Sequence, residues 1–572
     1  MSMHEIRQTK GWRIAGMLVP FGLTAWMTFY TMQVLRPYCI GIFPTFSFQQ
    51  KLLISAAAGF LLTALLHTRH RAFAGKEHGS ARWGKHSDIK PFLDKNPMND
   101  IILSQTERLS LDQHLHPGLA NNVLVIGDTG AGKSRFYAKP NIMQMNASYV
   151  ITDPSGEHLA SEGRMLEANG YKIKVFDITD PKNSLHFNPF HYYKGPKDVR
   201  DFIDVLMENT TGDTSNPHST DDFWVKSERL WFSAHINYVL ETCAPEEQNI
   251  PSVMKLLNAS EVRDEDDDFV SAIDILFQKL EAQNPQSFAC LQYKKFKLAA
   301  GKTAKSILIS VAIRMQDFDI QEFSNLFSED ELHLEMLGQE KTALFLIMEE
   351  TSPTYNYMIA LVLSVLFNVQ VKVAKQQSSR KLPIRLRCII DEIANIGKFP
   401  HFENLLATLR KYEVSFEPIY QDIGQIKHQY KDSFSTILSC CPTKLFLGGT
   451  GEETTKYVSE QMLGDATIAT KSSGDSASGT MGKNSHSENE QSAGRKLLDI
   501  TEVASLPPDE CIVKIKGLPP FRSKKYDLTV HPNYKLLADD PNTKGYAFHR
   551  EQQGQAVTLQ MNYITEIELE DE

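Results

Sequence analysis

The segment NNVLVIGDTGAGKS at residues 121–134 restricts the possible fold more than any other part of the chain. Its apolar residues 123–126 predict a buried strand, and a complete phosphate-binding loop, Gly-x-x-x-x-Gly-Lys-Ser, follows directly. A helix should begin after the loop and point its positive end at bound phosphates. This order predicts an α/β fold whose nucleotide-binding residues are Gly127, Asp128, Thr129, Gly130, Ala131, Gly132, Lys133 and Ser134.

The residue types in this loop follow from the chemistry of ATP. Glycines let the backbone turn tightly and direct its N–H groups at the phosphates. Lys133 would neutralise the β- and γ-phosphate oxygens, and Ser134 would ligate Mg²⁺. A second Gly-Lys-Thr, at residues 301–303, lacks both the upstream glycine and a preceding strand, so we interpret it as part of a helix.

A phosphate-binding loop needs a second strand that ends in carboxylates, and LRCIIDE at residues 386–392 provides one. Asp391 would hold the Mg²⁺ water shell beside Ser134, and Glu392 would polarise the attacking water. ALFLIMEE at 343–350 is an alternative strand ending in acids; its other interpretation is a neighbouring strand of the same sheet.

Two polar residues follow the acidic strand. Arg410 lies in ATLRKY, on an expected helix, and Gln421 follows FEPIY, an expected strand end. A glutamine there can sense the γ-phosphate, and an arginine at a subunit boundary can reach a neighbour's nucleotide. From the residues alone, Arg410 is better explained as a surface arginine and Gln421 as a cap or turn residue.

Two apolar segments near the N-terminus predict a membrane anchor. Residues 14–35 and 52–68 carry no charge and are long enough to cross a bilayer. A signal peptide is the alternative for the first segment, but no small-residue cleavage site follows it. Basic residues flank the pair on both outer sides, so both ends are expected in the cytoplasm, beneath the cell membrane.

Composition refines this picture in two ways. The net charge of −10 argues against a surface coated with basic residues but leaves a local basic channel open. The seven cysteines include no Cys-x-x-Cys, which indicates reduced thiols in a cytosolic setting.

The long interval between loop and acidic strand predicts an insertion with helical periodicity. Residues 464–494 are rich in serine and glycine and predict a flexible loop. The last residues, ITEIELEDE, are a solvated end or a docking tail for a basic partner.

The expected parts are an anchor at 1–70 (spans about 14–35 and 50–68), a nucleotide-binding domain at 71–197 continuing at 337–535, an all-α domain at 198–336 and an acidic tail at 536–572.

Several motifs together resemble the type IV coupling proteins of conjugation, the TraG/TraD family, within the RecA-like FtsK/HerA-type ATPases. The resemblance extends from the anchor to about residue 535 and is most specific in DPSGEHL and DEIANIGKFP. The other matching stretches are GSARWG at 79–84, GDTGAGKS at 127–134, FNPF at 187–190, LRKY at 409–412, YQDIGQI at 420–426, and the region from KYVSEQMLG to FRSKKY.

The resemblance implies a RecA-like ATPase that uses ATP and Mg²⁺ as a homo-hexamer on a membrane stem. It places Arg410 where the family carries a finger arginine and Gln421 where it carries a sensor glutamine. It also implies relaxase-bound single-stranded DNA and other channel proteins as partners, with cargo engaged at the all-α domain. It gives Asp153 and Glu157 of DPSGE no role that we can derive.

Three other functions stay open at this point. They are an FtsK-like translocase of double-stranded DNA, a coupling ATPase that recruits effector proteins, and a non-hydrolysing membrane scaffold. Glu392 argues against the scaffold, because a dead ATPase has no need of a residue that polarises water.

Overall fold

The computed structural model describes residues 10–34, 46–68, 79–210, 219–262, 269–299, 301–475, 486–539 and 545–550. The chain forms two compact units. The smaller unit comprises Met1–Ala81 and Gly464–Lys496, and the larger one comprises Arg82–Leu463 and Leu497–Glu572.

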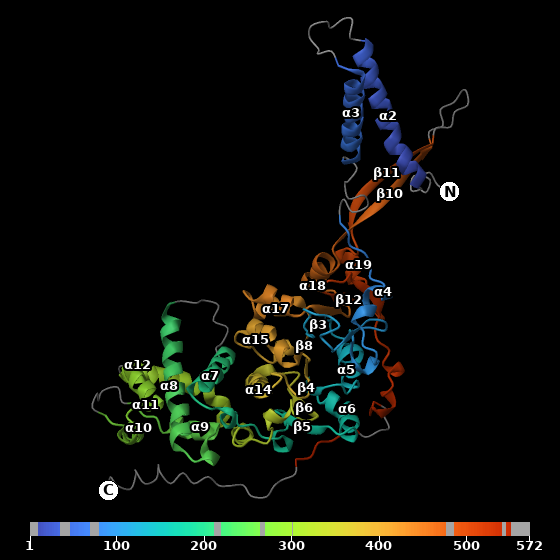
Figure 1. The fold of residues 1–572 in the computed structure, drawn as a ribbon. Helices are drawn as coiled ribbons and strands as arrows, with labels where there is room; N and C mark the ends of the chain where they lie inside the picture. Colours follow the sequence, from blue (N-terminus) through green and yellow to red (C-terminus); the bar gives the residue numbers. More distant parts are fainter. Residues whose placement is uncertain are drawn as a thin grey trace, which may run out of the picture. The chain divides into compact units, whose positions relative to one another are not determined.

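In the smaller unit, two long helices lie against each other (Figure 1): α2 (Lys10–Val34) and α3 (Phe48–Thr68). Gly59 is essential to this contact, because a Cβ there would lie 2.9 Å from the backbone oxygen of Phe21. Small residues at a helix contact allow this close approach.

The N-terminal helices are therefore present, but their role as membrane spans stays a prediction. Within the described residues, the helix long and apolar enough to cross a membrane is Pro353–Gln376, and 78% of its most apolar window is buried. Most of this segment is α14 (Tyr357–Gln376), which lies in the core of the larger unit.

The prediction of a flexible loop at 464–494 is wrong for the residues described. They form two antiparallel strands, β10 (Asp465–Asp475) and β11 (His486–Lys496), paired from Asp465↔Lys496 to Asp475↔His486. Polar composition excludes a buried core, but an antiparallel pair satisfies its backbone groups by mutual hydrogen bonds and needs no buried face. This segment also belongs to the unit of α2 and α3 rather than to the nucleotide-binding part.

The larger unit is built on a nine-stranded sheet in the order β13-β12-β9-β3-β8-β7-β4-β6-β5. The seven strands from β9 to β5 are parallel, and β12 and β13 add antiparallel at one edge. The strands are β3 (Val123–Ile126), β4 (Ser148–Asp153), β5 (Lys172–Asp177), β6 (Thr342–Ile347), β7 (Leu386–Ile390), β8 (Val414–Tyr420), β9 (Thr443–Phe446), β12 (Glu510–Ile515) and β13 (Phe521–Lys524). The α/β fold expected from the phosphate-binding loop is confirmed.

Alternation along the strands divides the core between the two faces of the sheet. In β3, Val123 and Val125 pack into one apolar cluster, and Leu124 and Ile126 pack into the other. Figure 1 shows α5 (Lys139–Ile142) and α6 (Glu157–Ala168) on one side of the sheet and α14 with α15 (Phe402–Leu409) on the other.

Between β5 and β6 the described residues form helices and irregular chain, which accords with the predicted helical insertion. The helices of this region are α7 (Pro196–Thr210), α8 (Ser219–Thr242), α9 (Ile250–Asn258), α10 (Ala272–Gln283), α11 (Phe288–Phe296), α12 (Gly301–Met315) and α13 (Gln321–Leu326). The second Gly-Lys-Thr opens α12, as expected. Since this region clusters with the sheet in one compact unit, its status as a separate domain at 198–336 stays a prediction.

The other α-helices described in this unit are α4 (His86–Ile89), α16 (Ile423–Gln429), α17 (Phe434–Cys440), α18 (Glu452–Tyr457) and α19 (Ile500–Ala504). After β13 the chain continues over α6, where Tyr546 donates its backbone N–H to the carbonyl of Ala160 at 2.9 Å. Residues 551–572, most of the predicted acidic tail, lie outside the described residues.

Candidate nucleotide-binding site

The parallel strands bring four chain segments to one edge of the sheet. The phosphate-binding loop follows β3, Gln421 follows β8, Asp391 and Glu392 follow β7, and Asp153 ends β4. Because these strands are parallel neighbours, their carboxyl ends meet at a single edge, where α/β proteins bind ligands. Residues that are distant in the sequence therefore come together here.

The phosphate-binding loop is held by its backbone. The N–H of Gly127 donates to the carbonyl of Tyr420 at 3.1 Å, and the N–H of Asp128 donates to that of Gly448 at 3.0 Å. Gly132 adopts φ +81°, which L side chains rarely adopt, and a Cβ there would lie 2.5 Å from the ring of Phe136. The loop then passes into a short helical turn, η3 (Ser134–Ala138), that leads to α5.

Ser134 and Asp391 face each other, as the sequence predicts for a Mg²⁺ site. The Ser134 hydroxyl donates to Oδ2 of Asp391 at 3.0 Å. Burial raises the pKa of the Asp391 carboxyl, and the charge of His158 with the hydrogen bond from Ser134 offsets part of that rise. A hydroxyl and a buried carboxylate are oxygen ligands of the kind Mg²⁺ prefers, so these two residues fit the ion.

Lys133, Glu392 and Gln421 form a second cluster beside this pair. Lys133 Nζ lies 3.4 Å from Oε1 of Glu392, and Gln421 Nε2 donates to both oxygens of Glu392 at 3.0 and 2.9 Å. Glu392 itself has φ +49°, an unusual conformation for a residue with a side chain. Such strained residues concentrate at functional sites. Lys133 and Gln421 can thus connect a bound phosphate group to Glu392, the carboxylate that would orient the attacking water.

The structure gives Asp153 a local role that the sequence did not indicate. Its carboxylate accepts from the backbone N–H groups of His158 at 3.1 Å and Leu159 at 2.8 Å, so it caps the first turn of α6. Glu157 instead forms an ion pair with Lys139 at 2.9 Å and is largely exposed. Asp153 therefore positions α6 beneath the site.

A buried histidine on α6 adds positive charge near Asp391. Burial alone would lower the pKa of His158, but the Glu162 carboxylate, 3.0 Å away, outweighs this and raises the pKa to about 9. The protonated form of His158 favours the ionised form of Asp391.

Arg410 does not reach this site within its own chain. It precedes β8, at the opposite edge of the sheet, and donates to the carbonyl of Gly118 at 3.1 Å. The strand β8 covers seven residues, and at about 3.3 Å per residue it separates the two edges by roughly 20 Å.

Two contacts of the loop were not foreseen. Asp128 does not face the phosphate position but accepts from the backbone N–H of Thr450 at 2.8 Å. Lys525 donates to the carbonyl of Ala131 at 3.0 Å, which places a second ammonium group on the loop.

The competing strand at 343–350 is β6, separated from β3 by three strands, and it is a neighbour in the sheet rather than the acidic strand of this site.

Comparison with known proteins gives one family and a group of solved structures. Residues 92–542 match the family described as Type IV secretory system Conjugative DNA transfer. Protein VirD4 of Rhizobium radiobacter is 23% identical over 466 residues, which cover 79% of this chain and 64% of that protein. Conjugal transfer protein TraG of Rhizobium radiobacter is 21% identical over 409 residues, covering 70% of this chain and 60% of that protein. The chain thus spans less than two thirds of the length of each.

The solved structures support the same fold. The unbound bacterial conjugative coupling protein TrwBdeltaN70 superposes with a TM-score of 0.55 at 14% identity, covering 78% of this chain and 92% of that one. The plasmid coupling protein TrwB in complex with ADP and Mg²⁺ has the same TM-score at 16% identity, covering 78% and 92%.

Proposed function

The chain belongs to the conjugative DNA-transfer family of type IV secretory systems, and from this premise we propose that it is a membrane-anchored ATPase that recruits relaxase-bound single-stranded DNA and drives it through the secretion channel. The observation that carries this proposal is the meeting of Lys133, Ser134, Asp391, Glu392 and Gln421 at one sheet edge. The DNA substrate and the secretion channel are inferred from membership of the family. The use of ATP hydrolysis as the energy source is inferred from the residues of the site.

Each residue of the site has a role in the proposed hydrolysis. Lys133 binds the β- and γ-phosphates, and Ser134 with Asp391 would hold Mg²⁺. When bound, Mg²⁺ supplies charge neutralisation at the phosphate oxygens. Glu392 orients and polarises the attacking water, and Gln421 holds Glu392 in place and reports on the γ-phosphate. Lys133 pairs with Glu392 at 3.4 Å, so a bound phosphate would compete with Glu392 for the same positive charge.

The position of Arg410 supports a ring in which subunits share sites. Because Arg410 lies at the edge of the sheet opposite its own phosphate-binding loop, it can complete a nucleotide site only in a neighbouring copy. Head-to-tail contacts of this kind close into rings. We propose a homo-hexamer in which Arg410 serves the neighbour's γ-phosphate.

The described parts of α2 and α3 support the membrane anchor. Large apolar side chains on both helices are more than half exposed, as expected for a surface that faces lipid. They are Leu18, Val19, Leu23, Trp26, Met27 and Tyr30 on α2, and Phe48, Leu52, Leu53, Phe60 and Leu61 on α3. With basic residues at the outer flanks, we place the ATPase in the cytoplasm beneath the cell membrane.

The proposal is tested by ATP turnover of the full chain in detergent or nanodiscs. We expect turnover to rise severalfold on addition of single-stranded DNA and to respond less to a duplex of equal length. Stimulation by duplex alone would favour a double-stranded DNA translocase, and the absence of turnover would favour a scaffold. Crosslinking in mating cells should capture relaxase and the transferred strand; capture of effector proteins alone would contradict the DNA-transfer role.

Replacing Arg410 by alanine should lower ATP turnover by about 10³-fold with little change in nucleotide affinity, as for a finger arginine. Mixing Arg410→Ala chains with Lys133→Ala chains should restore activity, because about a quarter of the sites in a mixed ring then pair an intact loop with an intact arginine. No recovery on mixing, in rings shown by mass measurement to contain both chains, would exclude a role in trans. Lys411→Ala, one residue away, is the matched control.

A further inference from the structure

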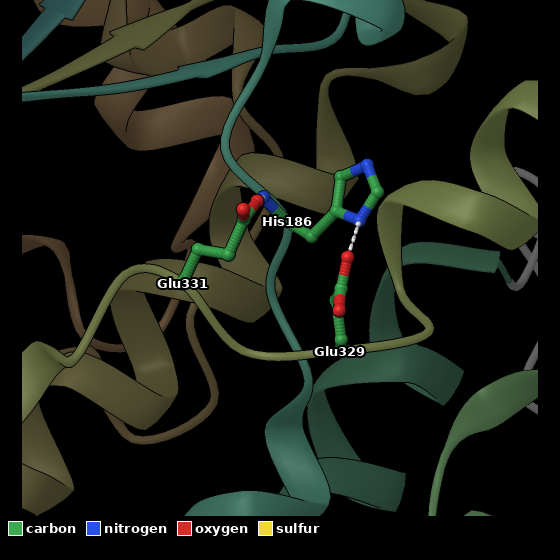
Figure 2. A group of neighbouring side chains, drawn as sticks. All are labelled: His186, Glu329 and Glu331. Carbon is green, nitrogen blue, oxygen red and sulfur yellow. Dashed lines mark hydrogen bonds and ion pairs between the residues drawn. The ribbon is translucent and has the colours of Figure 1, made fainter. Parts of the chain in front are cut away.

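Outside the nucleotide site, one histidine and two glutamates form a tight cluster in the larger unit. Figure 2 shows His186 facing Glu329 and Glu331, and ligand atoms of the three lie within 4.8 Å of one another. His186 Nδ1 lies 3.0 Å from Oε1 of Glu329, and the backbone N–H of His186 donates to Glu331 at 2.8 Å. By distance alone such a group could hold a metal ion.

The cation at this cluster is already present, and it is an arginine of the same chain. Arg550 Nη1 lies 2.8 Å from His186 Nε2, and its Nη2 donates to Glu329 at 2.9 Å. Its Nε lies 3.0 Å from Oε2 of Glu331. A neutral His186 with its proton on Nδ1 satisfies the two shorter ring contacts, since it donates to Glu329 and accepts from Arg550 Nη1. The cluster is therefore a receptor for a guanidinium group.

The receptor lies where the chain leaves the sheet and where it returns. His186 is on the outgoing connection from β5 to α7, and Glu329 and Glu331 are on the returning connection from α13 to β6. Backbone hydrogen bonds already join the two connections: Phe187 donates to the carbonyl of Leu326 at 2.8 Å, and Glu331 donates to that of His186 at 3.0 Å. Arg550 thus contacts both connections between the sheet and the helical region.

The segment that carries Arg550 is also attached to the sheet side. The ring of Tyr546 packs against Gly163 of α6. A Cβ on Gly163 would lie 2.7 Å from this ring, so the contact needs a residue without a side chain. The hydroxyl of Tyr546 donates to Glu167, also on α6, at 2.9 Å. Residues 545–550 therefore span from α6, the helix capped by Asp153, to the two connections.

We propose that residues 545–550 form a releasable latch, in which Arg550 binds the receptor formed by His186, Glu329 and Glu331 and restrains the helical region against the nucleotide-binding sheet. Release of Arg550 removes the contact that ties both connections to the segment held on α6, and leaves the connections joined by their own backbone and side-chain hydrogen bonds. The latch is independent of the proposed ATPase function, because its geometry involves none of the nucleotide-site residues.

Protonation of His186 provides a means of release. Burial and the charge of Arg550 lower the pKa of His186, against the opposing effect of Glu331 and Glu329. The latched form thus favours the neutral ring, and a proton on Nε2 would replace the bond from Arg550. Latching is complete above the ordinary histidine pKa of about 6.5 and is lost as the pH falls below it.

Hydrogen exchange of the full chain tests the latch directly. In Arg550→Ala, the amides of Phe187 and Glu331 should exchange about tenfold faster than in the wild type, because a charge-assisted contact that stabilises them is lost. Arg522→Ala on β13, which removes an ion pair with Glu510 on β12, is the matched control and should leave these amides unchanged. Equal exchange in Arg550→Ala and the wild type would overturn the latch.

A second variant isolates the effect of the proton. His186→Gln can donate to Glu329 and accept from Arg550 but cannot titrate in this range. Comparing the two proteins at each pH cancels the intrinsic pH dependence of exchange. Between pH 7.5 and 5.5 the wild-type amides should lose protection relative to the glutamine variant. Parallel behaviour of the two across this range would exclude His186 as the trigger.

Discussion

Replacing Lys133 by alanine should reduce ATP turnover by about 10³-fold or more, because the γ-phosphate loses the ammonium group proposed to neutralise it. Lys133 is nearly buried and lies 3.4 Å from Glu392, so its charge acts in a site with little water to screen it. DNA transfer in a mating assay should be lost with it. The measurements are steady-state ATP turnover of the purified full chain and the frequency of transconjugants.

The chain offers a matched control for this substitution. Lys302 lies in the second Gly-Lys-Thr, is exposed and opens α12, so Lys302→Ala should leave turnover unchanged. Membrane insertion of the Lys133 variant should equal that of the wild type, because α2 and α3 belong to the other compact unit. Normal turnover in Lys133→Ala would contradict the assignment of the nucleotide-binding site. A loss of turnover in Lys302→Ala would indicate that the nucleotide binds at the start of α12 instead.

The nucleotide-site geometry could be anticipated from the sequence because its determinants are local. A phosphate-binding loop must follow a strand, and Asp391 and Glu392 end another apolar run, so a parallel sheet brings them to one edge. The structure brings Ser134 to Asp391 and Gln421 to Glu392 accordingly. The sequence favoured the strand at 386–392 and left the one at 343–350 open as an alternative, and the sheet order separates the latter from β3 by three strands.

Other features depend on contacts that no local pattern records. Asp153 caps a helix only because the chain turns sharply through Ser155 and Gly156, both at positive φ. Arg550 meets His186 across 364 residues of sequence, so neither residue predicts the other. The strand pair formed by residues 465–475 and 486–496 was not predicted, because a polar composition shows only that a segment lacks a buried core. The two strands are held together by backbone pairing, which composition does not reveal.

The second large effect is expected from an ion pair buried in the sheet. Arg387 on β7 and Glu417 on β8 are both inaccessible to solvent, and the guanidinium contacts the carboxylate at 2.7 and 2.8 Å. Arg387→Met should destabilise the larger unit by about 3–5 kcal/mol, because Glu417 is left as an uncompensated buried charge. The measurement is the urea midpoint of unfolding in detergent at fixed protein concentration.

The cause of this loss can be separated from simple loss of packing. If the loss came from packing alone, removing the charge of Glu417 as well would recover none of it. Arg385→Met, which breaks a partly exposed pair with Glu413, should cost less than about 1 kcal/mol.

A double variant decides whether the pair matters beyond stability. In Arg387→Met with Glu417→Gln, the buried charge is gone and the amide oxygen still accepts from Tyr137, so we expect recovery of about 2 kcal/mol or more. Tyr137 lies on the turn after the phosphate-binding loop, while Asp391 and Gln421 directly follow β7 and β8. The parallel ladder Ile389↔Glu417 fixes the strand register by backbone bonds alone. ATP turnover should therefore return together with stability; stable protein with low turnover would instead show that the ion pair itself aligns the three elements of the site.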